Sequence, residues 1–192
     1  MVNPAISNLV IMLVMMQVSK RVPFEDPQVL MGIRILYVVA QVLVLGLYLY
    51  TRSIITKKND LTTLKYVEPA NAFGGQEEPK LVTTTIKEYD IKQVNSAIRG
   101  VFTGIAMMGF MHIYMKYTNP LLLQSIMPIK SAIEQNIVQI HVFGKPAIGD
   151  LKRPFKAASM FGGAGMGGGD IKTDKKTISA AETAGAGGVK EE

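Results

Sequence analysis

Cysteine is absent from the 192-residue chain, and histidine occurs only twice. Without cysteine there are no disulfide bonds, thiolate metal sites or thiol-dependent reactions, and two histidines argue against a histidine metal cage. No grouping of serine, lysine or aspartate suggests hydrolysis. The sequence therefore predicts a protein that is not an enzyme and that holds neither a metal ion nor a cofactor.

Charge is missing from long stretches of the chain, although charged residues make up 19% of it and apolar residues 48%. Ile35–Tyr50 carries no charged residue. As a helix, residues 28–50 would be about 34 Å long, enough to cross the roughly 30 Å hydrocarbon core of a bilayer. Asp26-Pro27 is typical of a helix start. The cations that follow the helix suit a cytosolic surface: Arg52, Lys57 and Lys58.

Similar helix-start signals divide the rest of the chain into further helices. Asn3-Pro4 and Asn119-Pro120 each open one, and Asp90 is a plausible N-cap for another. The last of these segments contains Pro128, so we interpret it as kinked, interfacial or re-entrant. The fold class predicted is all-α, a polytopic helical membrane protein with three long membrane helices and this fourth helix.

The predicted segments follow in chain order: a short first membrane helix at 1–20, a central membrane helix at 27–58 that extends into the cytosol, a soluble insertion at 59–89, a third membrane helix at 90–117, an amphipathic or re-entrant helix at 120–142, and a basic, largely disordered cytosolic tail at 143–192. Met1–Val18 lacks the basic start and cleavage site of a signal peptide, so we expect it to stay as a helix. Val82–Tyr89 could pair as a short strand, but no other segment offers it an obvious partner.

Basic residues near the membrane ends indicate the orientation. Residues 51–66 and 145–156 both carry an excess of lysine and arginine, which places both in the cytosol. The chain must then return through about residues 120–140. In the alternative topology the chain crosses the membrane three times and its N-terminus is lumenal. This topology agrees better with the number of long helices but less well with the charges of the loops.

Two arginines lie inside the apolar segments, Arg34 and Arg99, with no acidic residue in the three long apolar stretches to neutralise them. An ionisable side chain at membrane depth is a functional candidate by default. Polar side chains at helical spacing extend each arginine into a stripe: Tyr37, Gln41 and Tyr48 on the central helix, and Thr103 on the third. Our hypothesis is that the two stripes line a hydrated, cytosol-open groove for client helices. In the alternative, each arginine snorkels to the headgroups.

Three further sets of residues complete the prediction. Methionines cluster on the first and third helices, where an adaptable apolar surface would suit client helices of varied sequence, although gap-filling and lipid contact explain them equally well: Met12, Met15, Met16, Met107, Met108 and Met111. Small residues predict close helix packing: Gly100, Gly104 and Gly109. Cations are expected to contact ribosomal RNA or anionic lipid headgroups: Lys57, Lys58, Lys152, Arg153 and Lys156. We interpret His112 as an interfacial histidine.

Several blocks carry a family resemblance: residues 11–17, 59–72, 106–121, 143–156 and 173–176. They resemble the fungal endoplasmic-reticulum membrane protein family named for inorganic phosphate transport, also known as the third component of the SRP-independent targeting pathway. The resemblance implies a multi-pass protein of the endoplasmic-reticulum membrane that delivers or inserts membrane proteins. The partners it implies are the Sec translocon, the ribosome, the other components of that pathway and client membrane proteins.

Three functions remain open from the sequence. A targeting factor or insertase would use the groove and the methionines. A non-catalytic scaffold for the translocon would need neither arginine. A transporter of inorganic phosphate would bind the anion with Arg34 and Arg99, but the chain lacks the internal inverted repeat and the paired broken helices common in transporters.

Overall fold

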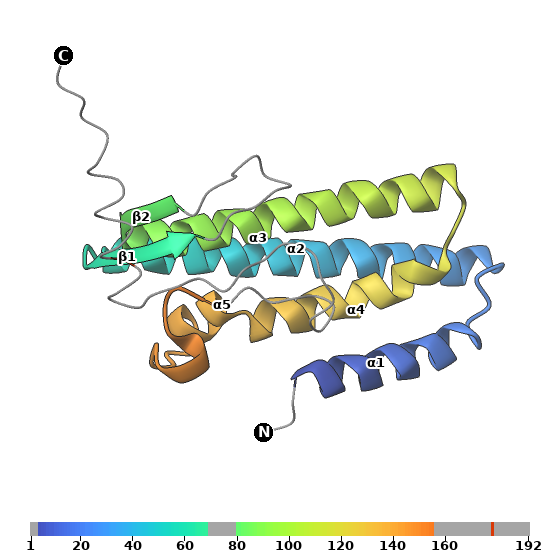
Figure 1. The fold of residues 1–192 in the computed structure, drawn as a ribbon. Coiled ribbons are helices and arrows are strands. Elements are labelled where there is room, and N and C mark those ends of the chain that lie inside the picture. Colours follow the sequence, from blue (N-terminus) through green and yellow to red (C-terminus); the bar gives the residue numbers. More distant parts are fainter. Residues whose placement is uncertain (1–3, 69–79, 156–177, 179–192) are drawn as a thin grey trace, which may run out of the picture. The chain divides into compact units, whose positions relative to one another are not determined.

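The computed structural model describes residues 4–68, 80–155 and the single position 178. It is mostly helical, with one small antiparallel sheet (Figure 1). The chain divides into two compact units. Unit 1 comprises residues 1–54 and 92–143, and unit 2 comprises residues 55–91 and 144–192.

Unit 1 is a set of helices whose sequences are mostly apolar. It contains α1 (Pro4–Ser19), most of α2 (Pro27–Lys58), most of α3 (Ile86–Gly109) with its π-helical continuation η2 (Phe110–Tyr114), α4 (Asn119–Glu134) and α5 (Asn136–His141). Asp26 caps α2 as its sequence predicted, because the Gln28 N–H donates to its carboxylate at 2.8 Å. Helix α1 has 16 residues and is therefore about 24 Å long, short for a full crossing.

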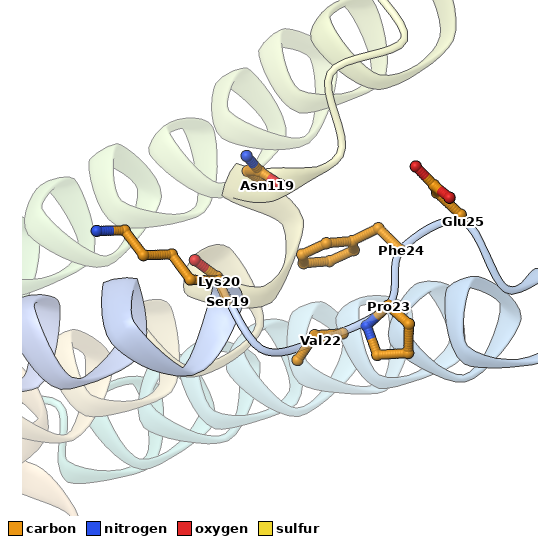
Figure 2. A pocket seen from close by; sticks show the side chains of 7 residues that line it. All are labelled: Ser19, Lys20, Val22, Pro23, Phe24, Glu25 and Asn119. Atoms are coloured by element: carbon orange, nitrogen blue, oxygen red, sulfur yellow. The ribbon is translucent and has the colours of Figure 1, made fainter.

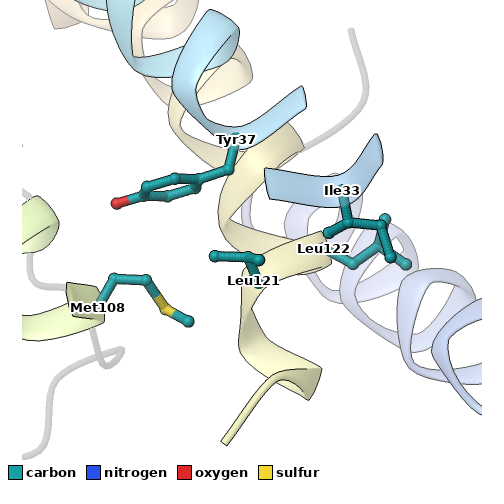
Figure 3. Packing of buried hydrophobic residues seen from close by; sticks show 5 residues of the cluster. All are labelled: Ile33, Tyr37, Met108, Leu121 and Leu122. Carbon is teal, nitrogen blue, oxygen red and sulfur yellow. The ribbon is translucent and has the colours of Figure 1, made fainter. Parts of the chain in front are cut away.

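One hydrophobic cluster ties α2, α3 and α4 together (Figure 3). Ile33 and Tyr37 come from α2, Met108 from α3, and Leu121 and Leu122 from α4. Side chains of α1 and of the loop after it pack against this cluster: Met15, Val22 and Phe24. The cluster lies toward the α2 N-terminus, so it fixes the position of the α3 C-terminal end beside the start of α2.

Two helices are long and apolar enough to span a membrane: α2, and α3 with its π-helical end to Tyr114. The prediction of three long membrane helices is therefore reduced to two long helices and the shorter α1. In the most apolar 18 residues of each helix, 28% of the α2 positions and 6% of the α3 positions are buried by the rest of the chain. Both helices thus leave wide apolar faces for lipid or protein.

The fourth predicted helix is interrupted, but not at its proline as the sequence predicted. Pro128 sits inside α4, which runs on to Glu134. The helix ends at Gln135, whose ψ of 133° is extended, and α5 starts at the next residue.

Unit 2 is built around a β-hairpin that the all-α prediction omitted. Strand β1 (Thr63–Glu68) pairs antiparallel with β2 (Lys80–Thr85), with Thr63 opposite Thr85 and Glu68 opposite Lys80. The partner that seemed missing for the predicted strand is thus β1. Large side chains buried in this unit include Tyr66, Tyr89 and Phe155.

The start of α3 was also predicted wrongly. The helix begins at Ile86 and not at Asp90. A capping box sets this start: the Glu88 N–H donates to Thr85 Oγ1 at 3.2 Å, and the Thr85 N–H donates to Glu88 Oε2 at 3.4 Å. The sequence signal was present as Thr-x-x-Glu at residues 85–88.

The first part of the predicted disordered tail is folded. Residues 144–155 carry a short 3-10 helix, η3 (Gly149–Leu151), and end on the buried Phe155. The rest of the predicted tail, apart from position 178, lies outside the described residues, as does Lys156.

Candidate functional site

Arg34 and His112 meet at the end of unit 1 where α2 starts and α3 ends. Arg34 Nε donates to His112 Nε2 at 3.0 Å. A guanidinium nitrogen can only donate, so Nε2 is the acceptor and the imidazole is neutral, with its proton on Nδ1. His112 lies in the π-helix η2, a geometry that occurs frequently at functional sites.

A cleft of about 420 Å³ adjoins this pair. It is lined by Leu30, Arg34, His112, Ile113, Lys116 and Thr118, all of them in unit 1. Of the described residues that line it, two are cations and none is a carboxylate, so it favours an anion. The sequence analysis did not predict this site. The available signal was a histidine and a lysine four residues apart at the end of a helix, His112 and Lys116, but His112 was interpreted without Lys116.

A second hollow at the same end of unit 1 differs in its charges (Figure 2). Its volume is about 350 Å³, and Ser19, Lys20, Val22, Pro23, Phe24, Glu25 and Asn119 line it. Because Lys20 and Glu25 carry opposite charges, this hollow has no preference for an anion.

The other polar residues of the predicted α2 stripe lie on the packed face of the helix. Tyr37, Gln41 and Tyr48 are buried. Arg34 is exposed. Three of the four residues therefore pack against neighbouring side chains, and Arg34 alone lines a cleft.

Gln41 has a structural task that explains its burial. Its Nε2 donates to the backbone carbonyl of Gln124 at 3.3 Å. In a regular helix that carbonyl would accept from the N–H of residue 128, but residue 128 is proline and has no N–H. The Gln41 amide thus satisfies the carbonyl freed by Pro128, and it joins α2 to α4 while doing so.

The structure separates the two arginines. Arg99 precedes His112 by 13 residues on α3, which is roughly 20 Å along the helix axis. Arg34 precedes Arg52 by 18 residues on α2, or roughly 27 Å. Arg99 and Thr103 are both exposed, and the Thr103 hydroxyl bonds to the Arg99 carbonyl at 2.9 Å.

The six methionines fall into different environments. Met108 is buried in the cluster of Figure 3, and Met15 packs against that cluster. Met12, Met16 and Met107 are exposed, and Met111 is half-buried. Only the exposed ones remain available as an apolar surface for another helix.

The glycines of α3 do not serve close packing within the described residues. A Cβ placed on Gly100, Gly104 or Gly109 would meet no atom within 4 Å. Each of these three positions therefore faces open space, as far as the described residues reach.

A polar group also links α1 to α4. Lys130 Nζ donates to Asn8 Oδ1 at 2.6 Å and forms an ion pair with Glu134 at 2.6 Å. The ion pair neutralises the two charges of α4, and the Asn8 contact holds the short α1 against it.

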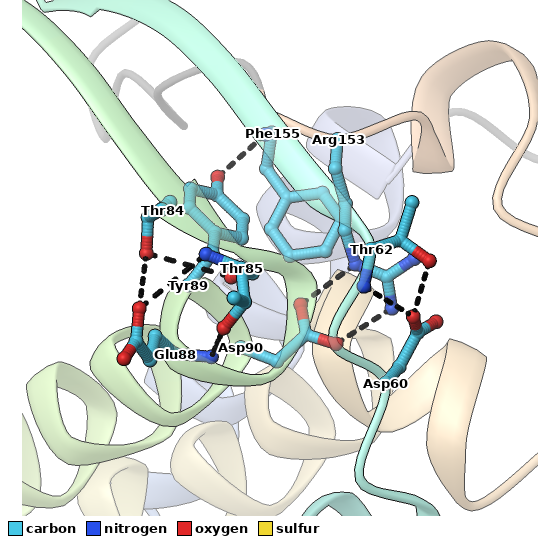
Figure 4. Close-up of polar contacts among 9 residues, drawn as sticks. All are labelled: Asp60, Thr62, Thr84, Thr85, Glu88, Tyr89, Asp90, Arg153 and Phe155. Carbon is cyan, nitrogen blue, oxygen red and sulfur yellow. Dashed lines mark hydrogen bonds and ion pairs between the residues drawn. The ribbon is translucent and has the colours of Figure 1, made fainter.

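Unit 2 contains a buried ion pair (Figure 4). Arg153 donates from Nε and Nη2 to the two carboxylate oxygens of Asp90, both at 2.7 Å. The Asp90 side chain is fully buried, and that of Arg153 is 10% exposed. The Phe155 N–H donates to the Tyr89 hydroxyl at 2.7 Å, and the two rings lie 5.6 Å apart. Arg153, predicted as a headgroup or RNA contact, instead fastens residues 153–155 to the start of α3.

The other predicted cationic contacts are more accessible. Lys57, Lys58 and Lys152 are exposed. Near them, hydrogen bonds from the Thr62 hydroxyl and N–H lower the pKa of Asp60 below its usual 3.8.

Comparison with known proteins identifies similar chains. The family described as "Phosphate transport (Pho88)" matches residues 2–189. A Saccharomyces cerevisiae protein named "SRP-independent targeting protein 3" is 58% identical over 190 residues, which cover 99% of this chain and 100% of the relative. A Schizosaccharomyces pombe protein named "SRP-independent targeting protein 3 homolog" is 42% identical over 180 residues, covering 94% of this chain and 91% of the relative. No solved structure matches the chain.

Proposed function

Since the chain belongs to the family described as phosphate transport (Pho88), we propose that it is a membrane-protein targeting and insertion factor of the endoplasmic reticulum. One observation carries the proposal: the relative named as an SRP-independent targeting protein is 58% identical over its whole length. The likeness covers 99% of this chain, so the proposal rests on nearly all of it.

The uncovered helices support this role physically. A factor that receives client helices must offer apolar surface that its own fold does not fill. Helix α3 has that property, since 6% of its most apolar positions are buried. Exposed Met107 on α3, with Met12 and Met16 on α1, would give such a surface unbranched side chains that adapt to many client shapes.

Fewer residues form the hydrophilic part of the proposed groove than the sequence suggested. We assign it to Arg99 and Thr103, which are exposed on α3. Arg34 belongs to the cleft at the other end of unit 1, and Gln41 supports α4. Proposed partners are the Sec translocon, the ribosome, the other SRP-independent targeting components and clients. We propose that the C-terminal tail lies in the cytosol, where Lys57, Lys58 and Lys152 would contact RNA or anionic lipid.

Replacement of the relative tests the function directly. In a Saccharomyces cerevisiae strain that lacks the 58% identical protein, expression of this chain should restore insertion of membrane proteins that do not use the signal recognition particle. Insertion into microsomes from that strain is scored by glycosylation of a lumenal site on the client. A chain that is present in microsomes at the normal level but does not restore insertion would rule out the role.

Site-specific crosslinking tests the client surface. A photoreactive residue at position 103 or 107 should label a stalled client helix, while one at position 43, an exposed leucine of α2, serves as the control. Labelling at 43 alone would contradict the assignment.

Two other functions give different results. A scaffold predicts that Arg99→Leu leaves insertion intact, while loss of residues 156–192 abolishes it. A phosphate transporter, which the family description favours, predicts saturable phosphate flux in liposomes that contain only this protein. Insertion without flux supports the targeting role.

A further inference from the structure

The described residues of the cleft beside η2 present hydrogen-bond donors and no carboxylate. Arg34 uses its Nε on His112, and in the described part of the chain this leaves the paired Nη groups for a second acceptor. Lys116 adds an ammonium group and Thr118 a hydroxyl. Thr118 is the N-cap residue of α4 but makes no side-chain capping bond, so its hydroxyl is not used by the helix.

The backbone that positions these groups is specific. The π-helix η2 places His112 toward Arg34, and Lys116 then takes a left-handed conformation with φ of 54° before the chain enters α4. Non-glycine residues seldom adopt that conformation, and it turns the chain sharply enough to bring Lys116 and Thr118 to the same cleft.

His112 is incompletely satisfied in this arrangement. Its Nε2 accepts from Arg34, so its proton is on Nδ1, and Nδ1 is buried with no hydrogen-bond partner among the residues that the structure describes. A buried donor without an acceptor is unfavourable. Among the described residues, the bond to Arg34 is therefore the only side-chain hydrogen bond of the His112 ring, and an anion that binds the guanidinium would fix both side chains further.

The surroundings of the cleft are those of a membrane surface. Five large side chains at the end of α3 and just after it are exposed: Phe110, Ile113, Tyr114, Met115 and Tyr117. The Phe110 and Tyr114 rings stack with their centroids 5.1 Å apart. Exposed aromatic residues beside lysine and arginine at a helix end are typical of the headgroup level of a bilayer.

We propose that Arg34, Lys116 and Thr118, with His112 orienting Arg34, bind the phosphate group of an anionic membrane lipid. The guanidinium would take two phosphate oxygens, the ammonium and the hydroxyl would take a third, and the acyl chains would lie along Leu30 and Ile113. Inorganic phosphate shares the first part of this chemistry but gains nothing from the apolar lining. This site is independent of the proposed targeting role, because it is tested by binding alone.

Native mass spectrometry of the purified full-length protein tests the site. The protein in maltoside micelles is incubated with dioctanoyl phosphatidylglycerol, dioctanoyl phosphatidylcholine or inorganic phosphate. We expect one tightly retained phosphatidylglycerol, with phosphatidylcholine bound at least tenfold more weakly because its choline finds no carboxylate in the cleft. Lys116→Gln and Arg34→Gln should each weaken phosphatidylglycerol binding by about tenfold or more, and Arg34→Lys by less.

Lys20→Gln is the matched control, since Lys20 lines the mixed-charge hollow at the same end of unit 1. It should change binding less than twofold. Lys116 is exposed, so Lys116→Gln should keep the helical circular dichroism and melting temperature of the parent, and its result decides the matter. Equal losses in Lys116→Gln and Lys20→Gln would overturn the site, as would equal binding of the two lipids. Retention of inorganic phosphate that phosphatidylglycerol cannot displace would overturn its assignment to a lipid.

Discussion

Replacing Gln41 by leucine should weaken the packing of α2 against α4, because it removes a hydrogen bond between the two helices. The Gln41 amide donates to the Gln124 carbonyl, which Pro128 leaves without its helical partner. Leucine fills a similar volume but donates nothing, so the part-buried carbonyl would lose its donor. An unpaired buried carbonyl costs about 1–3 kcal/mol. Hydrogen bonds between membrane helices average about 0.6 kcal/mol and reach about 1.7 kcal/mol.

We therefore expect Gln41→Leu to lower the free energy of unfolding by about 1 kcal/mol, or roughly fivefold in the folding equilibrium. Pro128→Ala restores a backbone N–H that can bond to Gln124. In the Pro128→Ala background, Gln41→Leu should cost close to nothing. The measurement is unfolding of the purified protein in mixed micelles by a denaturing detergent, followed by helical circular dichroism.

Gln124→Leu is the control, because it changes the side chain of residue 124 and keeps the carbonyl. It should leave the free energy of unfolding nearly unchanged. If Gln41→Leu costs the same with proline and with alanine at position 128, the amide does not serve the freed carbonyl, and the explanation given for Gln41 is wrong.

Three further predictions concern unit 2. Asp90→Asn should cost about 3–5 kcal/mol, since it removes the buried carboxylate to which Arg153 donates two hydrogen bonds; we expect faster tryptic cleavage after Lys152, and an unchanged cleavage rate would contradict the pairing. Thr85→Ala should cost about 1 kcal/mol by removing the capping box with Glu88, measured as lost amide protection in the first turn of α3, whereas Thr83→Ala should not affect that turn. The lowered pKa of Asp60 means that its carboxylate stabilises the folded state above the unfolded pKa of 3.8, and that this contribution is lost as the pH falls through the lower folded value. Protection factors of the hairpin amides should therefore fall below about pH 4, and Asp60→Asn should remove that dependence; a pH profile identical in the two proteins would refute it.

The long helix α2 could be predicted closely because its signals are local. A capping aspartate, proline at the first helical position, a charge-free apolar run and terminal lysines all act within one segment. The start of α3 failed for a different reason. Asp90 looked like a cap, but its carboxylate is committed to Arg153, 63 residues later in the chain. The capping box at residues 85–88 was local and could have been found.

The candidate site could not be predicted in full because its parts come from distant segments. Arg34 was singled out for its charge in an apolar helix, and that property belongs to the sequence. Its partner could not be read there, because His112 is 78 residues away and reaches Arg34 through a π-helical turn that no residue preference dictates. Lys116 and Thr118 join the cleft only because the backbone turns sharply between α3 and α4.

By itself, the sequence determined the class of protein: apolar runs long enough for a bilayer, no cysteine chemistry, and blocks that identify the family. These features could be read from the sequence because the length of an apolar run and the signals that start and end a helix depend only on neighbouring residues. Only the tertiary structure decided which polar groups face water and which face one another. It turned Gln41 into the support of a proline-containing helix, Arg153 into a buried ion-pair partner and Arg34 into the centre of a basic cleft, since a side chain takes its role from the groups brought within hydrogen-bond distance of it.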